Sequence, residues 1–128
     1  MSKKIIHTPK APQPVGPYSQ AIQLGNLLFI SGQIPLDPET GKLIKDDFPK
    51  QCRQVLNNVQ AILEAANTSL EQVVKVTIFL NDLSRFEEFN QIYSEYFGAY
   101  KPARSCVEVS ALPKGVALEI EAIAGLTI

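Results

Sequence analysis

Two segments of this 128-residue chain lack the polar face that a surface strand usually carries. Leu27–Ile30 is a continuous apolar run, and Val73–Leu80 carries apolar side chains on both faces, interrupted by Lys75 and Thr77. Strands with this pattern need cover on both sides, because leaving one side in water would expose a larger apolar patch than monomers usually show. Any sheet built from them therefore requires a layer on each of its faces.

The first predicted helix spans about residues 49–66 and supplies part of one layer. Its apolar residues recur at the spacing of one helical stripe: Val55, Val59, Ile62, Leu63 and Ala66. Asp46 or Asp47 is suited to cap its start, and Asn67 stands at its end. The helix is therefore expected to lie with this stripe against the sheet.

A second helix is predicted to begin at Ser84. The segment Ser84-Arg85-Phe86-Glu87 matches a capping box, in which the serine caps the amide of Glu87 and Glu87 reaches back. Aromatic residues dominate the stripe that follows: Phe86, Phe89, Tyr93, Tyr96 and Phe97. Such a stripe is typical of a helix packed into a core, so this helix is expected to cover the sheet as well.

The remaining segments are predicted as strands and turns. Strands are expected over residues 18–24, 27–30, 73–80, 104–109 and 116–123, with room for a further short strand at 42–44. Gly25-Asn26 is suited to a two-residue hairpin turn, and four prolines within residues 8–17 predict an extended, ordered loop. The β-β-α-β-α-β-β order indicates one α+β domain over residues 1–128, with two helices on one face. The second apolar face then requires another subunit.

Overall charge and the use of cysteine and histidine argue against several function classes. A formal net charge of −1 provides no global field for nucleic-acid phosphates. Cys52, Cys106 and the single histidine, His7, have no metal-site or disulfide spacing, so no metal is expected. The sequence shows neither a signal-peptide hydrophobic region nor an apolar run near the roughly 18 residues of a membrane helix. A cytoplasmic location without membrane insertion is the expectation.

Arg104 is the first candidate functional residue. It opens a strand whose neighbours look buried, and in strand alternation Arg104, Cys106 and Glu108 point the same way. A guanidinium near a core needs an anionic partner, because an unpaired buried charge is very costly. One interpretation is an internal salt bridge with Glu108, Glu119 or Glu121. The other is an anion site, in which Arg104 clamps a ligand carboxylate with two hydrogen bonds.

Glu119 and Glu121 alternate with apolar residues near the end of the chain, so both are expected on one face of the last strand. The plainer interpretation of each is a polar position on an amphipathic strand. Glu121, however, is followed by Ala122-Ile123-Ala124, which predicts partial burial. Desolvation raises a glutamate pKa from about 4.3 and turns the carboxyl group into a usable proton shuttle.

Three further positions carry weaker signals. Tyr18 presents a phenol at a loop-to-strand junction, where an ordinary interface aromatic is the plainer interpretation. Ser31-Gly32 matches neither a nucleophile elbow nor a phosphate-binding loop, and Gly32 is expected to mark a bulge or a close backbone approach. Cys106 is interpreted as a small buried hydrophobe, since no histidine lies near it in the sequence to activate it.

Four short motifs together resemble the RidA/YjgF family of reactive-intermediate deaminases. They are Gly-Pro-Tyr-Ser-Gln at residues 16–20, Ser-Gly-Gln-Ile-Pro at 31–35, Pro-Ala-Arg-Ser-Cys-Val at 102–107 and Glu-Ile-Glu-Ala at 119–122. The similarity extends over nearly the whole chain. It implies a chorismate-mutase-like (YjgF-like) α+β fold with a mixed β-sheet, assembled as a homotrimer with active sites in the clefts between subunits.

The same resemblance implies hydrolytic deamination of short 2-imino acids, 2-iminobutanoate and 2-iminopropanoate, to 2-keto acids and ammonia. The imines would be reactive by-products of pyridoxal-phosphate enzymes. Arg104 would bind the substrate carboxylate with help from the backbone around Cys106, and Glu121 would position or activate water, with Tyr18 beside them. No cofactor is implied, because the C=N carbon is already electrophilic. Further substrate contacts are implied for Ser31, Gly32 and Asn90.

Two other function classes remain open at the level of sequence. A regulatory module could bind a small carboxylate in the same intersubunit cleft without turning it over. An activity directed at RNA or protein is the second, since relatives in this family have been assigned ribonuclease and chaperone-like activities. The near-neutral net charge argues against tight RNA binding. Turnover of an imine would separate the enzyme from both alternatives.

Overall fold

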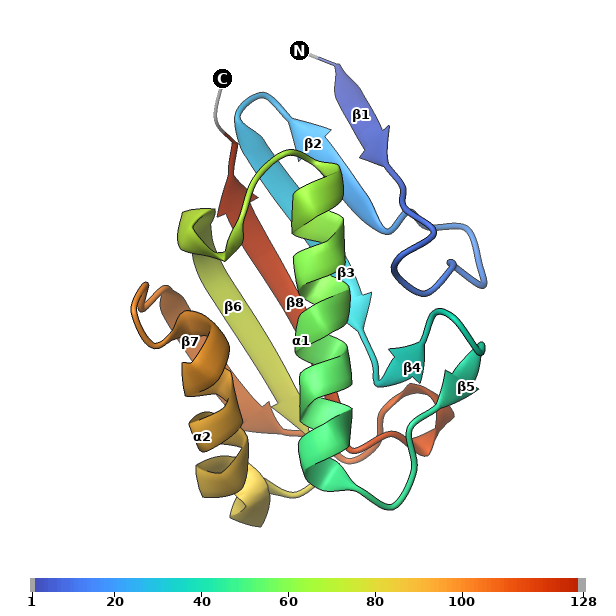
Figure 1. Cartoon of the computed structure of the whole chain (residues 1–128), viewed down its shortest axis with the longest axis vertical. Helices are drawn as coiled ribbons and strands as arrows, with labels where there is room; N and C mark the ends of the chain where they lie inside the picture. Colours follow the sequence, from blue (N-terminus) through green and yellow to red (C-terminus); the bar gives the residue numbers. More distant parts are fainter. Residues whose placement is uncertain (1, 127–128) are drawn as a thin grey trace.

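The computed structural model describes residues 2–126, and within this range a six-stranded mixed sheet carries both helices on one face (Figure 1). The sheet strands are β1 (Lys3–Ile6), β2 (Ala21–Leu24), β3 (Leu27–Gln33), β6 (Val73–Leu80), β7 (Ala103–Glu108) and β8 (Leu118–Gly125). The helices are α1 (Phe48–Ala65) and α2 (Phe86–Phe97), and β4 (Leu36–Asp37) forms a small separate hairpin with β5 (Lys42–Leu43).

Strand order in the sheet is β1-β2-β3-β8-β6-β7. Neighbouring strands pair antiparallel except β6 and β7, which are parallel because α2 makes the crossover between them. The predicted α+β class, with a mixed sheet and two helices on one face, is confirmed. The sequence pattern did not indicate β1, because this strand has four residues and only Ile6 is buried.

Helix α1 begins where the sequence predicts. Asp47 is the N-cap residue, and its Oδ1 accepts a hydrogen bond from the backbone N–H of Lys50 at 3.0 Å. Asp46, the alternative cap, instead adopts a left-handed conformation with φ of 59°. The predicted apolar stripe is buried against the sheet, apart from Ala66, which is partly buried.

The predicted capping box at the start of α2 is wrong. Ser84 lies in a 3-10 turn, Leu83–Arg85, that precedes the helix. The carboxylate of Asp82 accepts hydrogen bonds from the backbone N–H of Ser84 at 3.0 Å and from its hydroxyl at 2.7 Å. Asp82 therefore caps the 3-10 turn, and Arg85, not Ser84, occupies the N-cap position of α2, where no side chain caps the helix.

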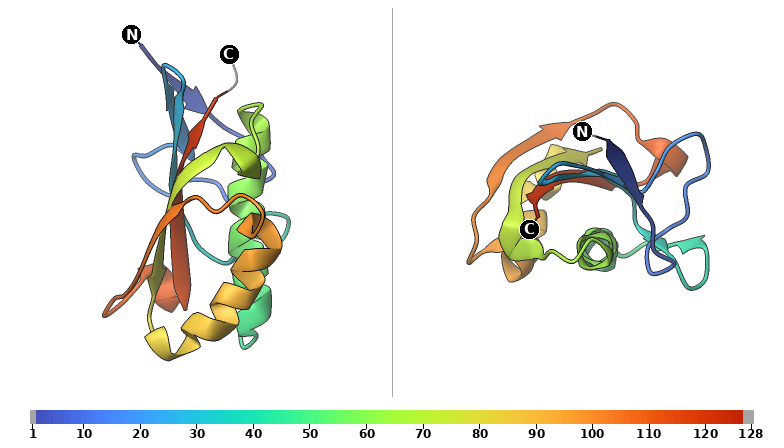
Figure 2. Two further views of the ribbon diagram at one scale, coloured as in Figure 1. Left: turned by 90° about the vertical axis from the view of Figure 1, so that its left-hand side faces the viewer. Right: turned by 90° about the horizontal axis from the view of Figure 1, so that it is seen from above.

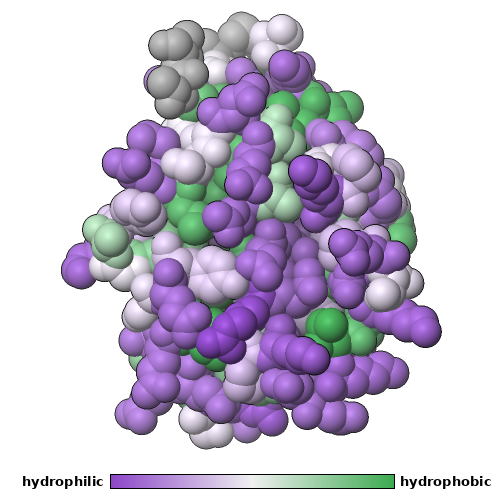
Figure 3. Space-filling view, in the orientation of Figure 1, coloured by the Kyte–Doolittle hydropathy of each residue, from purple (hydrophilic) through white to green (hydrophobic). Residues whose placement is uncertain are grey.

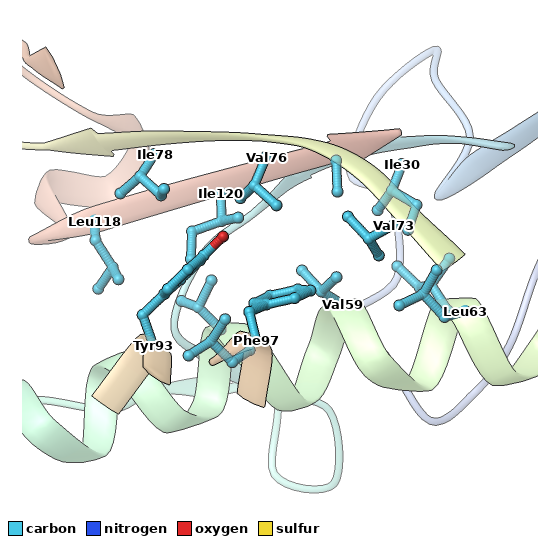
Figure 4. Close-up of a cluster of buried hydrophobic side chains, with 14 of the residues drawn as sticks. Ile30, Val59, Leu63, Val73, Val76, Ile78, Tyr93, Phe97, Leu118 and Ile120 are labelled. Carbon is cyan, nitrogen blue, oxygen red and sulfur yellow. The ribbon is translucent and has the colours of Figure 1, made fainter. Parts of the chain in front are cut away.

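The core lies between the helices and the face of the sheet that they cover (Figure 4). Side chains from the central strands meet side chains from both helices there, and all are at least nine-tenths buried. The residues labelled in the figure are Ile30, Val59, Leu63, Val73, Val76, Ile78, Tyr93, Phe97, Leu118 and Ile120. Both helices are therefore held to the sheet mainly by apolar burial.

A bulge on β6 changes which valine faces the core. Between Val73 and Lys75, β6 gains one residue relative to β8, and Val74 is the extra one. Strict alternation predicts that Val74 shares the buried face of Val76. Instead Val74 is 51% exposed and Val73 is 5% exposed, because the bulge reverses the alternation at this end of the strand.

A second bulge lies in β3 and confirms one of the two expectations for Gly32. Relative to β8, β3 contains one extra residue between Ile30 and Gln33, at Ser31-Gly32. Ile30 and Gln33 therefore both face the helices and are buried, although they are three residues apart. The bulge turns the Ser31-Gly32 backbone toward the opposite face of the sheet.

The proline-containing segment before β2 is ordered by one buried glutamine, as the extended-loop prediction requires. Oε1 of Gln20 accepts a hydrogen bond from the backbone N–H of Thr8 at 2.7 Å. Its Nε2 donates to the carbonyl oxygens of Thr8, Ala11 and Pro12. These bonds close the loop onto the start of β2 and place Tyr18 at its end.

The face of the sheet opposite the helices is apolar over several strands, and no helix within residues 2–126 covers it (Figure 2). Five large apolar side chains on this face are 38–62% exposed: Ile5, Leu24, Leu27, Phe29 and Val107. The side that carries the helices is mostly hydrophilic by contrast (Figure 3). The prediction that Leu27–Ile30 is buried on both faces is therefore wrong for one chain by itself, since only Leu28 and Ile30 are buried.

Within residues 2–126, no helix combines the length and the apolar character that crossing a membrane requires.

Candidate functional site

Arg104 lies on β7, which is the edge strand of the sheet. Parallel pairing sets Arg104 beside Val76 and Cys106 beside Ile78. Since Val76 and Ile78 point toward the helices, Arg104 and Cys106 do so as well. The strand is more exposed than its sequence suggested, because an edge strand has a neighbour on one side only.

The guanidinium of Arg104 has no carboxylate within salt-bridge distance among residues 2–126. Its Nη1 donates a hydrogen bond to Oδ1 of Asn90 at 2.6 Å. The group also lies over two aromatic rings of α2, with its carbon 4.8 Å from the ring centre of Tyr93 and 5.4 Å from that of Phe86. The internal salt bridge considered for Arg104, with Glu108, Glu119 or Glu121, is therefore not formed, and no carboxylate of residues 2–126 neutralises its charge.

Two cavities lie next to this arginine and its strand. One, of about 380 Å³, is lined by Arg104 together with Asn90, Tyr93 and Lys101. The other, of about 490 Å³, lies beside Cys106 and is bordered by Leu83, Ser84, Phe86 and Glu87. The surface therefore offers an accessible cation beside an opening with apolar walls, which suits a small carboxylate with a short side chain.

Burial sets the protonation of the two titratable groups next to Arg104. Desolvation raises the pKa of the Cys106 thiol, although the nearby Arg104 charge lowers it in part. Desolvation likewise raises the pKa of Tyr93 to about 12, again against the effect of Arg104. Cys106 is therefore a neutral thiol at pH 7, consistent with a packing residue and not with an activated nucleophile.

Glu119 is on the opposite face of the sheet, on β8, next to the Ser31-Gly32 bulge. Burial raises the pKa of its carboxyl group, and the negative charge of Glu121 raises it further. Gly32 permits this arrangement: a Cβ at position 32 would collide with Oε2 of Glu119 and would lie 2.8 Å from its carboxyl carbon. The close approach expected at Gly32 is therefore confirmed, and Glu119 is the group that approaches.

Glu121 shares the face of Glu119, as strand alternation predicts, but it is exposed. The expectation that Glu121 is partly buried is wrong. In register Glu121 lies between Thr77 of β6 and the Ser31-Gly32 bulge of β3, yet it is the side chain of Glu119 that packs against Gly32.

Ser31 and Tyr18 lie where the loop of residues 8–17 joins the sheet. The hydroxyl of Ser31 donates to the carbonyl oxygen of Ser19 at 2.6 Å, and its backbone N–H donates to that of Gln20 at 2.9 Å. The backbone N–H of Tyr18 donates to the carbonyl oxygen of Gly16 at 2.9 Å, and its side chain is 52% exposed. Ser31 thus fixes the backbone that carries Tyr18.

The residues singled out from the sequence fall into two groups within one chain. Arg104, Cys106 and Asn90 gather on the helix-covered face, at the β7 edge. Gly32 and the two glutamates of β8 lie on the opposite face. Arg104 and Glu121 therefore do not meet within one chain.

The aromatic residues that hold Arg104 and the difference between the two glutamates were missed from sequence. Phe86 and Tyr93 were assigned only to the core stripe of the helix. Asn90 stands between them at i+4 and i−3, and this spacing could have shown that it shares their face. Glu119 and Glu121 both point to the same face of β8, so no sequence signal separates them. They differ because the side chain of Glu119 packs against Gly32.

A further cavity of about 510 Å³ at the start of α1 shares no lining residue with the surroundings of Arg104. Lys45, Arg85 and Lys114 border it together with Asp46 and Asp47, so its lining carries charges of both signs. Among residues 2–126, no three histidine, cysteine, aspartate or glutamate side chains are grouped to hold a metal ion.

Known proteins match this chain in sequence over nearly its entire length. The family model described as endoribonuclease L-PSP matches residues 8–126. A RutC family protein of Pyrococcus abyssi is 58% identical over 124 residues, covering 97% of this chain and 98% of that protein.

Solved structures agree with this assignment. YyfA of Yersinia pestis, described as a member of the conserved Rid protein family, is 50% identical with a TM-score of 0.95, covering 98% of this chain and 100% of its own. E. coli TdcF, solved with bound serine, is 46% identical with a TM-score of 0.92, covering 97% of this chain and 99% of its own. Since sequence and fold agree over this length, the chain belongs to the RidA/YjgF family and has its YjgF-like fold.

Proposed function

We propose that this protein hydrolyses short 2-imino acids, such as 2-iminobutanoate and 2-iminopropanoate, to 2-keto acids and ammonia. The observation that carries the proposal is the guanidinium of Arg104, which is held in place, forms no ion pair with residues 2–126 and lies beside a cavity. TdcF, the neighbour solved with bound serine, supports a ligand of this class, because serine has a carboxylate and a nitrogen on adjacent carbons.

The proposed active site forms between two subunits of a homotrimer. Arg104 faces the helix side of the sheet and Glu119 faces the other side, so one copy cannot bring both to one ligand. A second copy packed on the uncovered apolar face would bury Leu27, Phe29 and Val107, whose exposed apolar surface indicates an interaction site. For the proposed site to form, this packing must bring Tyr18 and the bulge of one chain toward the β7 edge of its neighbour.

Glu119 is the better candidate for the residue that holds the attacking water. The sequence and its resemblance assigned this role to Glu121. Glu119, however, is the carboxyl group that has a raised pKa and packs against Gly32, whereas Glu121 is exposed. A carboxylate with a raised pKa is the stronger base and takes a proton more readily from water.

In the proposed reaction, Arg104 binds the carboxylate of the imine with two charge-assisted hydrogen bonds. Glu119 of the neighbouring subunit accepts a proton from water as the water oxygen bonds to C2 of the protonated imine, which forms a neutral carbinolamine. That proton then passes from Glu119 to the nitrogen. The C–N bond breaks as the hydroxyl oxygen forms the C=O bond and gives its own proton to Glu119, and ammonia leaves with the 2-keto acid. The protein contributes mainly by positioning, since the C=N carbon is already electrophilic.

Substrate size follows from the cavity beside Cys106. Leu83 and Phe86 line it with apolar surface, which suits the methyl or ethyl group of the two proposed imines. Glu87 lies on the same wall and would repel a second carboxylate, so imines of acidic amino acids are expected to be poor substrates.

The proposal is tested with 2-iminobutanoate generated in the assay by a pyridoxal-phosphate threonine dehydratase. The protein is expected to raise the rate of 2-oxobutanoate and ammonia release well above the spontaneous rate. A calorimetric titration with 2-oxobutanoate and with serine runs beside the assay. Binding of either compound without turnover would instead identify a regulatory module, and RNA cleavage that persists in Arg104→Ala would identify a different activity.

Gly32→Ala is expected to lower kcat by on the order of tenfold to a hundredfold, because the new methyl group displaces the carboxyl group of Glu119. Stability should change by less than about 1 kcal/mol, since the displaced group is the flexible end of a side chain. Steady-state kinetics and thermal melting check both expectations.

Gly125→Ala is the matched control for Gly32→Ala. A Cβ at position 125 meets its nearest neighbour, the carbonyl oxygen of Gln72, at an ordinary 3.7 Å, so activity should not change. In a Glu119→Gln background, Gly32→Ala should cost little more activity. Additive losses would show that Gly32 acts by another route.

A further inference from the structure

Three side chains of α2 together hold the guanidinium of Arg104. Phe86, Asn90 and Tyr93 lie on one face of the helix, and all three contact the guanidinium. Phe86 and Tyr93 do so through their rings and Asn90 through its amide oxygen. The two rings lie 5.4 and 4.8 Å from the guanidinium carbon, and Asn90 accepts its hydrogen bond at 2.6 Å. An arginine with this many contacts has lost much of its rotamer freedom before a ligand arrives.

The helix that carries these contacts is itself firmly packed. Phe89 and Tyr93 stack with ring centres 5.7 Å apart, and Tyr93 and Phe97 with centres 4.9 Å apart. The stack faces the sheet, with Tyr93 and Phe97 pointing toward Val76 and Ile120 in Figure 4. Asn90, one residue after Phe89, therefore presents its amide oxygen from a rigid support.

We propose that Asn90 is a positioning residue, which orients the guanidinium of Arg104 without neutralising it. This deepens the proposed function and rests on it, because the value of an unneutralised arginine lies in binding the carboxylate of the substrate. Asn90 was expected to contact the substrate, and the hydrogen bond from Nη1 of Arg104 to its Oδ1 gives it this further role.

The chemical reason for an amide at this position is its lack of charge. An aspartate at position 90 would have nearly the same shape and would accept the same hydrogen bond. Its carboxylate, however, would form an ion pair with Arg104 and compete with the carboxylate of the ligand for the same cation. A neutral acceptor holds one edge of the guanidinium and leaves the positive charge and the remaining N–H groups available.

Asn90→Asp and Asn90→Leu separate this role from a structural one. Asn90→Leu removes the acceptor, and we expect it to raise KM for 2-iminobutanoate and the Kd for 2-oxobutanoate about tenfold. Asn90→Asp keeps the shape and the acceptor, yet we expect it to raise both constants further than Asn90→Leu does. In both variants kcat should change less than KM, because the carboxylate contact is made in the ground state and the transition state alike.

Gln91→Glu is the matched control, since it adds the same negative charge at the next residue of α2, on an exposed side chain. It should leave KM and Kd within about twofold of the parent, because solvent screens an exposed charge. Melting temperatures of all three variants are measured on the same samples. Loss of folded protein would lower the apparent kcat and leave KM and Kd unchanged.

These measurements separate failure of the positioning role from failure of the proposed function. If Asn90→Asp binds 2-oxobutanoate as tightly as the parent, or if only melting temperatures change, the positioning role is wrong. If the parent hydrolyses imine but Asn90→Leu is more impaired than Asn90→Asp, the neutral-acceptor argument fails and the proposed function stands. If the parent binds 2-oxobutanoate without hydrolysing imine and the variants rank as expected, the positioning role stands and the proposed function fails.

Discussion

Arg104→Ala is expected to lower kcat/KM for 2-iminobutanoate by about a hundredfold or more. Two charge-assisted hydrogen bonds of about 1.5–3 kcal/mol each give about 3–6 kcal/mol, and each 1.4 kcal/mol is a factor of ten. Arg104→Lys keeps the charge but loses the planar pair of donors, so it should retain part of the activity. Initial rates of 2-oxobutanoate release over a range of imine concentrations measure both effects.

Loss of activity in Arg104→Ala is not expected to come from unfolding. Arg104 is exposed on an edge strand and has no ion pair among residues 2–126, so its removal should lower the melting temperature by a few degrees at most. Arg53→Ala is the matched control, because Arg53 is also exposed, and its 2.8 Å ion pair with Glu95 joins α1 to α2 away from the cavities. Full activity in Arg104→Ala would refute the carboxylate clamp.

Glu119→Gln is expected to lower kcat by on the order of a hundredfold to ten-thousandfold, the usual range for the loss of a general base. The parent enzyme should lose activity as the pH falls through the pKa of Glu119, which lies above the ordinary 4.5. That acidic limb should be absent from the residual activity of Glu119→Gln. Profiles of kcat/KM against pH for the two proteins measure the difference.

The same substitution should stabilise the fold at neutral pH. Because burial raises the pKa of Glu119, the folded state holds this proton more tightly than the unfolded state does. The stability that Glu119 contributes is therefore fully present below its unfolded-state pKa and is lost as the pH rises through its folded-state pKa. The melting temperature of Glu119→Gln should be higher than that of the parent at pH 7, and this difference should become smaller toward acidic pH.

Glu121→Gln decides which of the two carboxylates of β8 is the base. It replaces an exposed group, so its effect on kcat is expected to stay below about tenfold. A large loss in Glu121→Gln with little change in Glu119→Gln would return the role to Glu121. Equal large losses would indicate that the two groups titrate and act as a pair.

Short-range patterns determined most of the fold. Side chains that recur at helical spacing define the buried stripe of α1, and Asp47 caps that helix as a carboxylate just before a helix should. Val73–Leu80 coincides with β6, because seven of its eight residues are apolar or β-branched and only Lys75 interrupts them. Such elements depend on neighbours within a few residues, which the sequence displays directly.

Tertiary structure alone decided the chemistry around Arg104 and Glu119. Pairing of β7 with β6 turned Arg104 toward Asn90 and Tyr93, and the missing side chain at Gly32 left room for the carboxyl group of Glu119 against the bulge. Strand neighbours, bulges and contacts with α2 join residues that lie far apart in the chain. The alternation of side chains along a strand therefore identifies the face on which a residue lies, but not which residues pack against it. The burial of a side chain, and the pKa shift that follows from burial, depend on that packing.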